Sequence, residues 1–159
     1  MSYSQQYHTG QQRWQRMKTK GMIRIAVYGT LRQGFANHER YLSDHREARY
    51  IGPDQLVGVK LYLLGGGVVP VAVTTGDEDD KAAVEVYDVT PDLLEHIDLL
   101  EGVIDGVGYG AYVPVQMTTR SGLDVRAYMG SKDAWDEPMR PVYRNDYLSH
   151  ARSEIRDGT

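Results

Sequence analysis

Cysteine is absent from the 159-residue chain. Disulfide bonds, thiolate nucleophiles and zinc sites that use cysteine are therefore excluded. The five histidines do not replace it as metal ligands, because none of them falls in a recognised ligand spacing such as H-E-x-x-H. A P-loop and a G-x-S-x-G nucleophile motif are also missing. The sequence thus predicts neither a metal site nor a cofactor.

Long apolar runs and an excess of positive charge are missing as well. No stretch approaches the ~20 apolar residues of a membrane-spanning helix, and the N-terminus lacks the apolar core of a signal peptide. The 22 acidic residues outnumber the 18 lysines and arginines, which gives a net charge of -4 at pH 7. Binding of nucleic acid would need a basic patch. We therefore expect a cytoplasmic protein whose partner is neither a membrane nor a nucleic acid.

The length and the composition are those of one globular domain, with 41% hydrophobic and 25% charged residues. Residues 1–20 differ from the rest, because they carry basic side chains, no acidic ones and no apolar stripe. They predict a flexible polar arm. Residues 21–159 are then expected to form a single domain.

Several apolar stretches have the length and the β-branched content of strands, and most of them follow one another through glycine-containing turns. They lie at residues 23–28, 56–64, 68–74, 82–89, 112–118 and 125–129. The first stretch is apolar on both faces, as in a central strand covered on both sides. Pro70 lacks an N–H group, so its strand is expected at an edge of the sheet or on a bulge.

Helices are fewer than strands. Thr90 as the N-cap, Pro91 at the first helical position and Gly102 after the last turn bound the clearest one. Asn37 can cap a short helix, and residues 145–156 have the pattern of a surface helix. Because strand follows strand without an intervening helix, the predicted fold class is α+β, with a mixed or antiparallel sheet that can curl into a barrel.

A loop after the first strand is the first candidate for chemistry. The strand ends at Tyr28, Gly29, Thr30 and Leu31, and a second glycine follows at Gly34. Glycine lets backbone N–H groups approach an anion without obstruction by a side chain, so this loop can form a cradle for a carboxylate. An ordinary turn would have the same sequence.

Glu85 is the second candidate, because glutamate is depleted in strands and this one lies within residues 82–89. It shares a face with Ala83 and Tyr87, and partial burial there would raise its pKa toward neutrality. A carboxyl group in that range can accept and return a proton. An exposed glutamate on a solvated face is the alternative, and His38 beside the loop is a second candidate base.

Residues 27–42 (VYGTLRQGFANHERYL), 61–73 (LYLLGGGVVPVAV) and 84–102 contain three motifs in fixed order. Together they resemble the γ-glutamylcyclotransferase superfamily, and within it the γ-glutamylamine cyclotransferase and AIG2-like branch. The resemblance covers residues 23 to 130. It implies a curled, barrel-like mixed sheet with flanking helices.

The resemblance also implies an activity and a site. The substrate's α-amino group attacks its γ-carbonyl, which forms 5-oxoproline and releases an amine without a cofactor. The loop of Tyr28, Gly29, Thr30 and Leu31 would bind the γ-glutamyl group, and Glu85, in the E-V-Y motif, would be the general acid/base. The sequence departs from the family at Val84, where glycine is usual.

A further departure is the absence of an arginine at position 111, which is alanine. Two alternatives therefore stay open beside the γ-glutamylamine reaction. The chain could use another γ-glutamyl conjugate in a biosynthetic pathway, or it could be a non-catalytic module that binds a small ligand in the same pocket. Val84 would favour the module if it filled the pocket.

Overall fold

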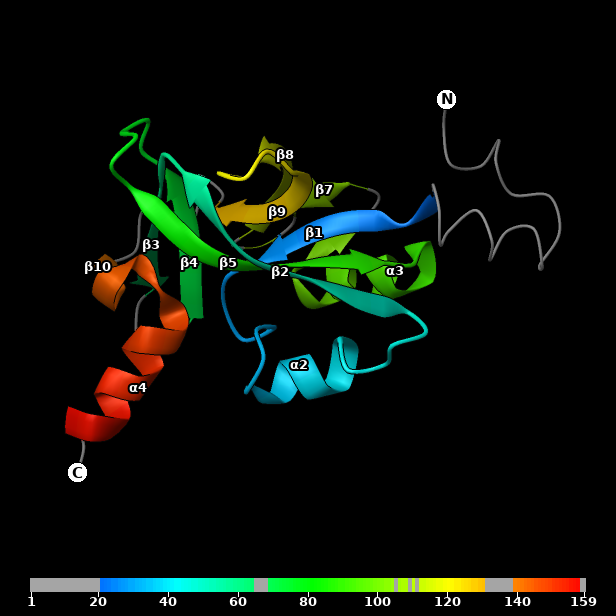
Figure 1. The fold of residues 1–159 in the computed structure, drawn as a ribbon, viewed down its shortest axis with the longest axis horizontal. Coiled ribbons are helices and arrows are strands. Elements are labelled where there is room, and N and C mark those ends of the chain that lie inside the picture. The colour runs from blue at the N-terminus through cyan, green and yellow to red at the C-terminus, as the bar shows by residue number, and fades with distance from the viewer. Residues whose placement is uncertain are drawn as a thin grey trace, which may run out of the picture.

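The computed structural model describes residues 21–64, 69–104, 106–108, 110, 112–130 and 139–157. The predicted arm over residues 1–20, the glycine turn at residues 65–67 and Ala111 lie outside the described residues. Most strands form one sheet, in the order β10-β3-β4-β9-β1-β5-β2, with β8 added beside β9 (Figure 1). These strands are β1 Ile23–Val27, β2 Ala48–Val57, β3 Val59–Leu64, β4 Val69–Thr74, β5 Lys81–Val89, β8 Tyr112–Thr118, β9 Asp124–Gly130 and β10 Met139–Pro141. A separate hairpin joins β6 Val103–Ile104 and β7 Val107–Gly108.

The sheet is mixed, as predicted. β1 pairs antiparallel with β5 and parallel with β9, and β9 in turn pairs parallel with β4. Alternate residues of β1 enter two separate cores, Ile25 and Val27 on one face and Ala26 on the other. The first core is covered by α2 Ala36–Tyr41 and α3 Pro91–Leu100, which lie on the same side of β1 and β5 (Figure 1). β1 is therefore a central strand buried on both faces, which confirms the predicted α+β fold with a curled mixed sheet.

The end of α3 matters most for the site. Thr90 caps its start and accepts a hydrogen bond of 3.2 Å from the N–H group of Leu93, with Pro91 at the first position. Glu101 is the C-cap, and Gly102 follows with φ +75°, a conformation that favours glycine. The predicted boundaries of this helix are thus confirmed. They place the Glu101 side chain where the helix meets the sheet.

Three local predictions were wrong. Gly58, with φ +76°, divides residues 56–64 between β2 and β3, and β2 begins earlier, at Ala48. Phe35, not Asn37, is the N-cap of α2. Pro70 lies on an inner strand, but β4 pairs with β9 only at Ala72, so the missing N–H group of the proline lies outside that ladder.

The C-terminal part contains a short 3₁₀ turn at Tyr143–Asn145 and α4 Tyr147–Asp157, where the surface helix was predicted. Asp146 precedes α4, and its carboxylate accepts hydrogen bonds from the N–H groups of Leu148 and Ser149.

Within the described parts of the chain, no helix is long and apolar enough to cross a membrane.

Candidate functional site

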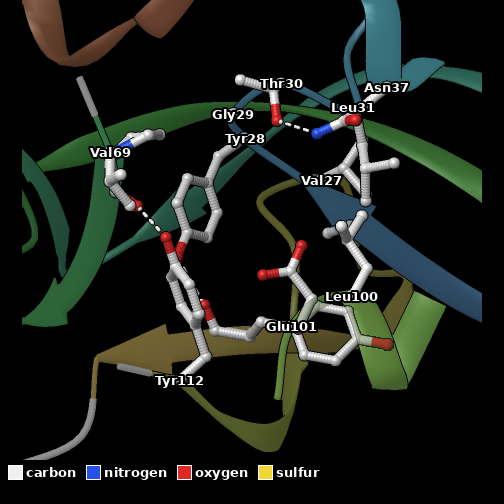
Figure 2. A pocket seen from close by; sticks show the side chains of 13 residues that line it. Val27, Tyr28, Gly29, Thr30, Leu31, Asn37, Val69, Leu100, Glu101 and Tyr112 are labelled. Atoms are coloured by element: carbon white, nitrogen blue, oxygen red, sulfur yellow. Dashed lines mark hydrogen bonds between the residues drawn. The ribbon is translucent and has the colours of Figure 1, made fainter. Parts of the chain in front are cut away.

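A cavity of about 200 Å³ opens where β1 ends, between the following loop, the C-terminal end of α3 and strands β4, β8 and β9 (Figure 2). This is far more than the space that one water molecule needs. The cavity is lined by Ala26, Val27, Tyr28, Gly29, Thr30, Leu31, Asn37, Val69, Pro70, Leu100, Glu101, Tyr112 and Tyr128. All four predicted binding residues of the loop are among them. Glu85 is not.

The loop contains backbone N–H groups that have no described acceptor. The N–H group of Arg32 donates to the carbonyl oxygen of Gly29 at 3.0 Å, which closes a turn around Thr30 and Leu31. The N–H groups of Gly29, Thr30 and Leu31 have no hydrogen-bond acceptor among the described residues. Buried or half-buried N–H groups are usually paired in folded proteins. Three adjacent N–H groups without a described acceptor, beside a cavity, can form a binding site for an anion.

Tyr28 has a structural role in addition. Its hydroxyl donates to the carbonyl oxygen of Tyr128 at 2.6 Å and accepts from the N–H group of Ala72 at 3.2 Å. The side chain therefore ties the end of β1 to both β9 and β4. Burial raises the pKa of this phenol well above its ordinary value, so the group stays protonated. Its ring forms one wall of the cavity (Figure 2).

Gly29 is required by packing. A Cβ atom at this position would lie 2.8 Å from Cγ of Pro70, closer than side-chain contacts allow. The absence of a side chain at Gly29 thus lets the loop pack against β4.

The Thr30 hydroxyl is held at the cavity by Asn37, whose amide donates to it at 2.8 Å. Because this contact uses one lone pair of the hydroxyl oxygen, the Thr30 O–H group remains free to donate. Asn37 lies in the first turn of α2. The asparagine of the motif that follows the loop therefore supports the loop.

Glu85 lies outside the cavity and holds the loop from behind. Its carboxylate accepts from Nε of Arg32 at 2.9 Å, from the N–H group of Gln33 at 2.9 Å and from the Tyr87 hydroxyl at 3.0 Å. Only 6% of the residue is exposed. Of the two alternatives that the sequence left open for Glu85, burial beside Tyr87 is the one that the structure shows. The structure does not bring Glu85 to the cavity that the predicted binding residues line.

Arg32 is shared between two carboxylates. Its Nη1 donates to Asp146 at 2.6 Å while its Nε donates to Glu85. Burial alone would raise the pKa of Asp146, but the hydrogen bond and the positive charge of Arg32 lower it below its ordinary value. The loop is thus joined to β5 on one side and to the start of α4 on the other.

Glu101 is the carboxylate that lines the cavity, and its side chain points into it, toward the side where Tyr28 to Leu31 lie (Figure 2). No described residue donates a hydrogen bond to this carboxylate. Burial, and after it the negative charge of Asp98, raises the pKa of Glu101 from 4.5 to about 7. The C-terminal end of a helix also disfavours negative charge, and the last turn of α3 has no basic residue.

Sequence reasoning did not single out Glu101, although a signal was present. A glutamate directly before the glycine that ends a helix lies at the negative end of the helix dipole. Such an unfavourable position can mark a carboxylate with a chemical role. His38 lies near the loop, where its Nδ1 is 3.0 Å from the carbonyl oxygen of Leu31, but it does not line the cavity.

Val84 does not obstruct the site. It belongs to the core on the opposite face of β5 from Glu85 and Tyr87 and is not part of the cavity lining. The departure from the family at Val84 therefore leaves the cavity open.

The described residues contain no group of three or more histidines and carboxylates that could hold a metal ion.

Comparison with known proteins agrees with this architecture. A protein from Methanocaldococcus jannaschii, provisionally named a gamma-glutamylcyclotransferase, is 31% identical over 105 residues, which are 66% of this chain and 80% of that protein. A relative from Pyrococcus horikoshii with the same provisional name is 36% identical over 110 residues, 69% of this chain and 81% of the relative.

Solved structures show the same fold. A crystal structure of a Pyrococcus horikoshii protein matches with a TM-score of 0.62 and 29% identity, over 84% of this chain and 97% of that one. An AIG2-like protein from mouse matches with a TM-score of 0.59 and 20% identity, over 79% and 88% of the two chains. The family model described as gamma-glutamyl cyclotransferase, AIG2-like, matches residues 25–149. The chain therefore belongs to the AIG2-like gamma-glutamyl cyclotransferase family.

Proposed function

We propose that this protein is a cyclotransferase that converts a γ-glutamyl amide of an amine into 5-oxoproline and the free amine, with Glu101 as the general acid/base. One observation carries the proposal. A carboxyl group with a pKa of about 7 lies in the same cavity as three backbone N–H groups that have no described acceptor. The role that the family resemblance implied for Glu85 is thus proposed for Glu101 instead.

The loop is proposed to hold the substrate. The N–H groups of Gly29, Thr30 and Leu31 can donate to the α-carboxylate of the γ-glutamyl group, and the Thr30 hydroxyl can add a fourth donor. Because the described lining of the cavity contains no arginine or lysine, backbone donors are the groups available for this anion. A fixed head group keeps the α-amino nitrogen near the γ-carbonyl carbon, and an intramolecular attack gains most from such positioning.

Glu101 is proposed to move the proton. The α-amino nitrogen attacks the γ-carbonyl carbon, the bond from that carbon to the amide nitrogen breaks, and a five-membered lactam closes. The attacking nitrogen loses one proton and the leaving nitrogen gains one, so a single carboxyl group between them can carry out both transfers. A pKa of about 7 suits this exchange at neutral pH, because both protonation states are then well populated.

The apolar rim of the cavity supports a substrate in which the group on the amide nitrogen carries no charge. Val69 and Leu100 are 41% and 38% exposed, and Pro70 lies beside them. Glu101 is the one charged residue of the described lining. An aliphatic amine would contact this rim favourably, whereas a peptide that ends in a carboxylate would find no positive partner there.

The proposal is tested by measuring 5-oxoproline release from γ-glutamyl alkylamines, from γ-glutamyl dipeptides and from a γ-glutamyl alkylamine whose α-carboxylate is amidated. We expect the alkylamines to react fastest and the amidated compound to react poorly. Equal rates for the amidated compound and the free acid would contradict the role of the loop. Binding of these compounds without any 5-oxoproline release would instead support a non-catalytic binding module.

A further inference from the structure

Beside the cavity, Asp98 of α3 contacts two side chains of β9. The Tyr128 hydroxyl donates to Oδ1 of Asp98 at 2.5 Å, and Nη2 of Arg126 donates to both carboxylate oxygens, at 2.9 and 2.8 Å. Asp98 and Arg126 are mostly buried, with side chains 16% and 19% exposed. Arg126 and Tyr128 are two residues apart on one strand, so they share the face on which α3 packs.

The cluster has a feature that stability alone does not explain. Nε of Arg126 is buried and has no hydrogen-bond partner among the described residues. An arginine frequently binds a carboxylate through two parallel hydrogen bonds from two nitrogens, whereas here the single nitrogen Nη2 contacts both oxygens and Nε is left over. A buried polar atom without a partner is unfavourable, and such atoms often mark groups that are held in place for another purpose.

Tyr128 connects this cluster to the cavity. Its ring lines the cavity together with Glu101, its hydroxyl is fixed by Asp98, and its carbonyl oxygen accepts from Tyr28. A change at Asp98 would therefore alter the position of Tyr128 and, through it, that of Tyr28, and these two residues both line the cavity. Glu101 itself lies three residues after Asp98, on the adjacent turn at the end of α3.

Among the described residues, the titratable and charged groups around Glu101 come from α3, β9, β8 and the end of β1. Asp98 lies near it on α3, and Tyr128 of β9 lines the same cavity. Tyr112 of β8 and Tyr28 at the end of β1 interact with its carboxylate electrostatically, and Arg126 of β9 is bound to Asp98. Burial raises the pKa of each of these three phenols, so they stay neutral near pH 7. Among the described residues, the charge that acts directly on Glu101 is the negative charge of Asp98, and Arg126 is the positive group paired with Asp98.

We propose that Asp98 and Arg126 are positioning residues for the reaction. Asp98 fixes Tyr128 beside Glu101 and keeps one negative charge next to the Glu101 carboxyl group. Arg126 holds Asp98 in place and partly offsets the negative charge of Asp98. This inference rests on the proposed function of Glu101. It agrees with the contribution of Asp98 to the raised pKa of Glu101, which is second to burial.

The test is a ¹³C NMR titration of the Glu101 carboxyl group in the full chain, with Glu101→Gln to assign the signal. The parent midpoint is expected near pH 7. Asp98→Asn removes the like charge and keeps the side-chain shape, so the midpoint should fall by roughly 0.5–1 unit. Arg126→Gln removes the opposing charge, so the midpoint should rise by a similar amount. Asp92→Asn, at the other end of α3, is the matched control and should cause no shift.

Opposite shifts in the two variants support the proposal, because a purely structural role would move both midpoints in one direction or not at all. An unchanged midpoint, or shifts of equal sign, would overturn it. If one variant does not fold, the sign of the shift in the other decides. The titration needs no substrate, so opposite shifts in a parent that releases no 5-oxoproline would support the roles of Asp98 and Arg126 around Glu101 while contradicting the proposed function.

Discussion

Glu85 and Glu101 are two shielded glutamates on opposite sides of one loop. Glu85 accepts three hydrogen bonds, one of them from an arginine, and these contacts hold Arg32 and Gln33 in place. Glu101 has no described donor, lies near Asp98 and occupies the C-terminal end of α3. The first carboxylate is surrounded by donors that stabilise its charge, and the second by groups that disfavour its charge.

The comparison shows that burial alone does not identify an acid/base carboxylate. A buried carboxylate with a full set of donors is a structural anchor, because its charge is already satisfied. A carboxylate without donors, in a cavity that a substrate can enter, exchanges its proton readily near neutral pH. Three measurements test whether the two glutamates differ in this way, and a fourth tests the packing of the loop between them.

The largest effect is expected for Glu101→Gln, which keeps the side-chain size but cannot accept a proton. General acid/base groups contribute roughly 10²–10⁴-fold to rate, so 5-oxoproline release should fall by about that factor. Turnover is measured per folded molecule on a γ-glutamyl alkylamine. Glu95→Gln, an exposed position on the same helix, is the control and should retain parental activity. Undiminished turnover in the Glu101 variant would contradict its proposed role.

Glu85→Gln should act mainly on stability. It leaves the buried Arg32 with Asp146 as its one carboxylate partner among the described residues. Breaking a buried ion pair costs about 3–5 kcal/mol, and the remaining partner places the expected loss near 3 kcal/mol. Urea unfolding measures it, with the exposed Glu78→Gln as a control. A variant as stable as the parent would show that Glu85 does not anchor the loop.

The pH dependence of stability should reveal Glu101 directly. Its pKa is raised from 4.5 to about 7, so folding favours its protonated form. Its contribution to stability is therefore fully present below about pH 4.5 and is lost as the pH rises through 7. At about 1.4 kcal/mol per pKa unit, this loss is roughly 3 kcal/mol.

Glu101→Gln lacks this titration. Its free energy of unfolding should increase relative to that of the parent between pH 4.5 and pH 8, because the parent loses stability as its carboxyl group ionises above its pKa of about 7. A constant difference between the two proteins across this range would mean that the Glu101 carboxyl group is not perturbed.

The smallest effect is expected for Gly29→Ala. The added Cβ would meet the Pro70 ring at 2.8 Å, and overpacking of this kind costs about 1–3 kcal/mol. Gly110→Ala is the matched control, because no described atom lies within 4 Å of a Cβ at that position. Equal stability of the two variants would show that the loop does not depend on this contact with β4.

Much of the fold could be predicted from local patterns. The cap at Thr90 and the glycine at Gly102 delimit α3, and the doubly apolar β1 lies in the centre of the sheet. The first half of β2 was missed because Gly52 and Pro53 are typical of a loop. An edge strand tolerates both residues. Among the described strands, β2 pairs on one side only, with β5, and it contains an irregularity between Tyr50 and Gly52.

The site could be predicted only in part. The residues of the binding loop are contiguous in sequence, so Tyr28 to Leu31 could be recognised as a unit. The partners of a buried glutamate come from distant segments, and period two alone cannot show that Arg32 folds over Glu85. The approach of Glu101 to the same loop depends on how α3 packs against the sheet, which is a tertiary property.

The most direct test of the assignment to Glu101 is the acidic limb of the pH profile of kcat/KM in the parent, in Glu85→Gln and in the residual activity of Glu101→Gln. This limb reports the essential base of the free enzyme. The parent and the Glu85 variant should share a midpoint near pH 7, the pKa of Glu101, and the Glu101 variant should lack the limb. A limb that disappears in Glu85→Gln and persists in Glu101→Gln would contradict the assignment. An acidic limb that is the same in all three proteins would contradict it too, because that limb would then belong to the substrate's own amino group.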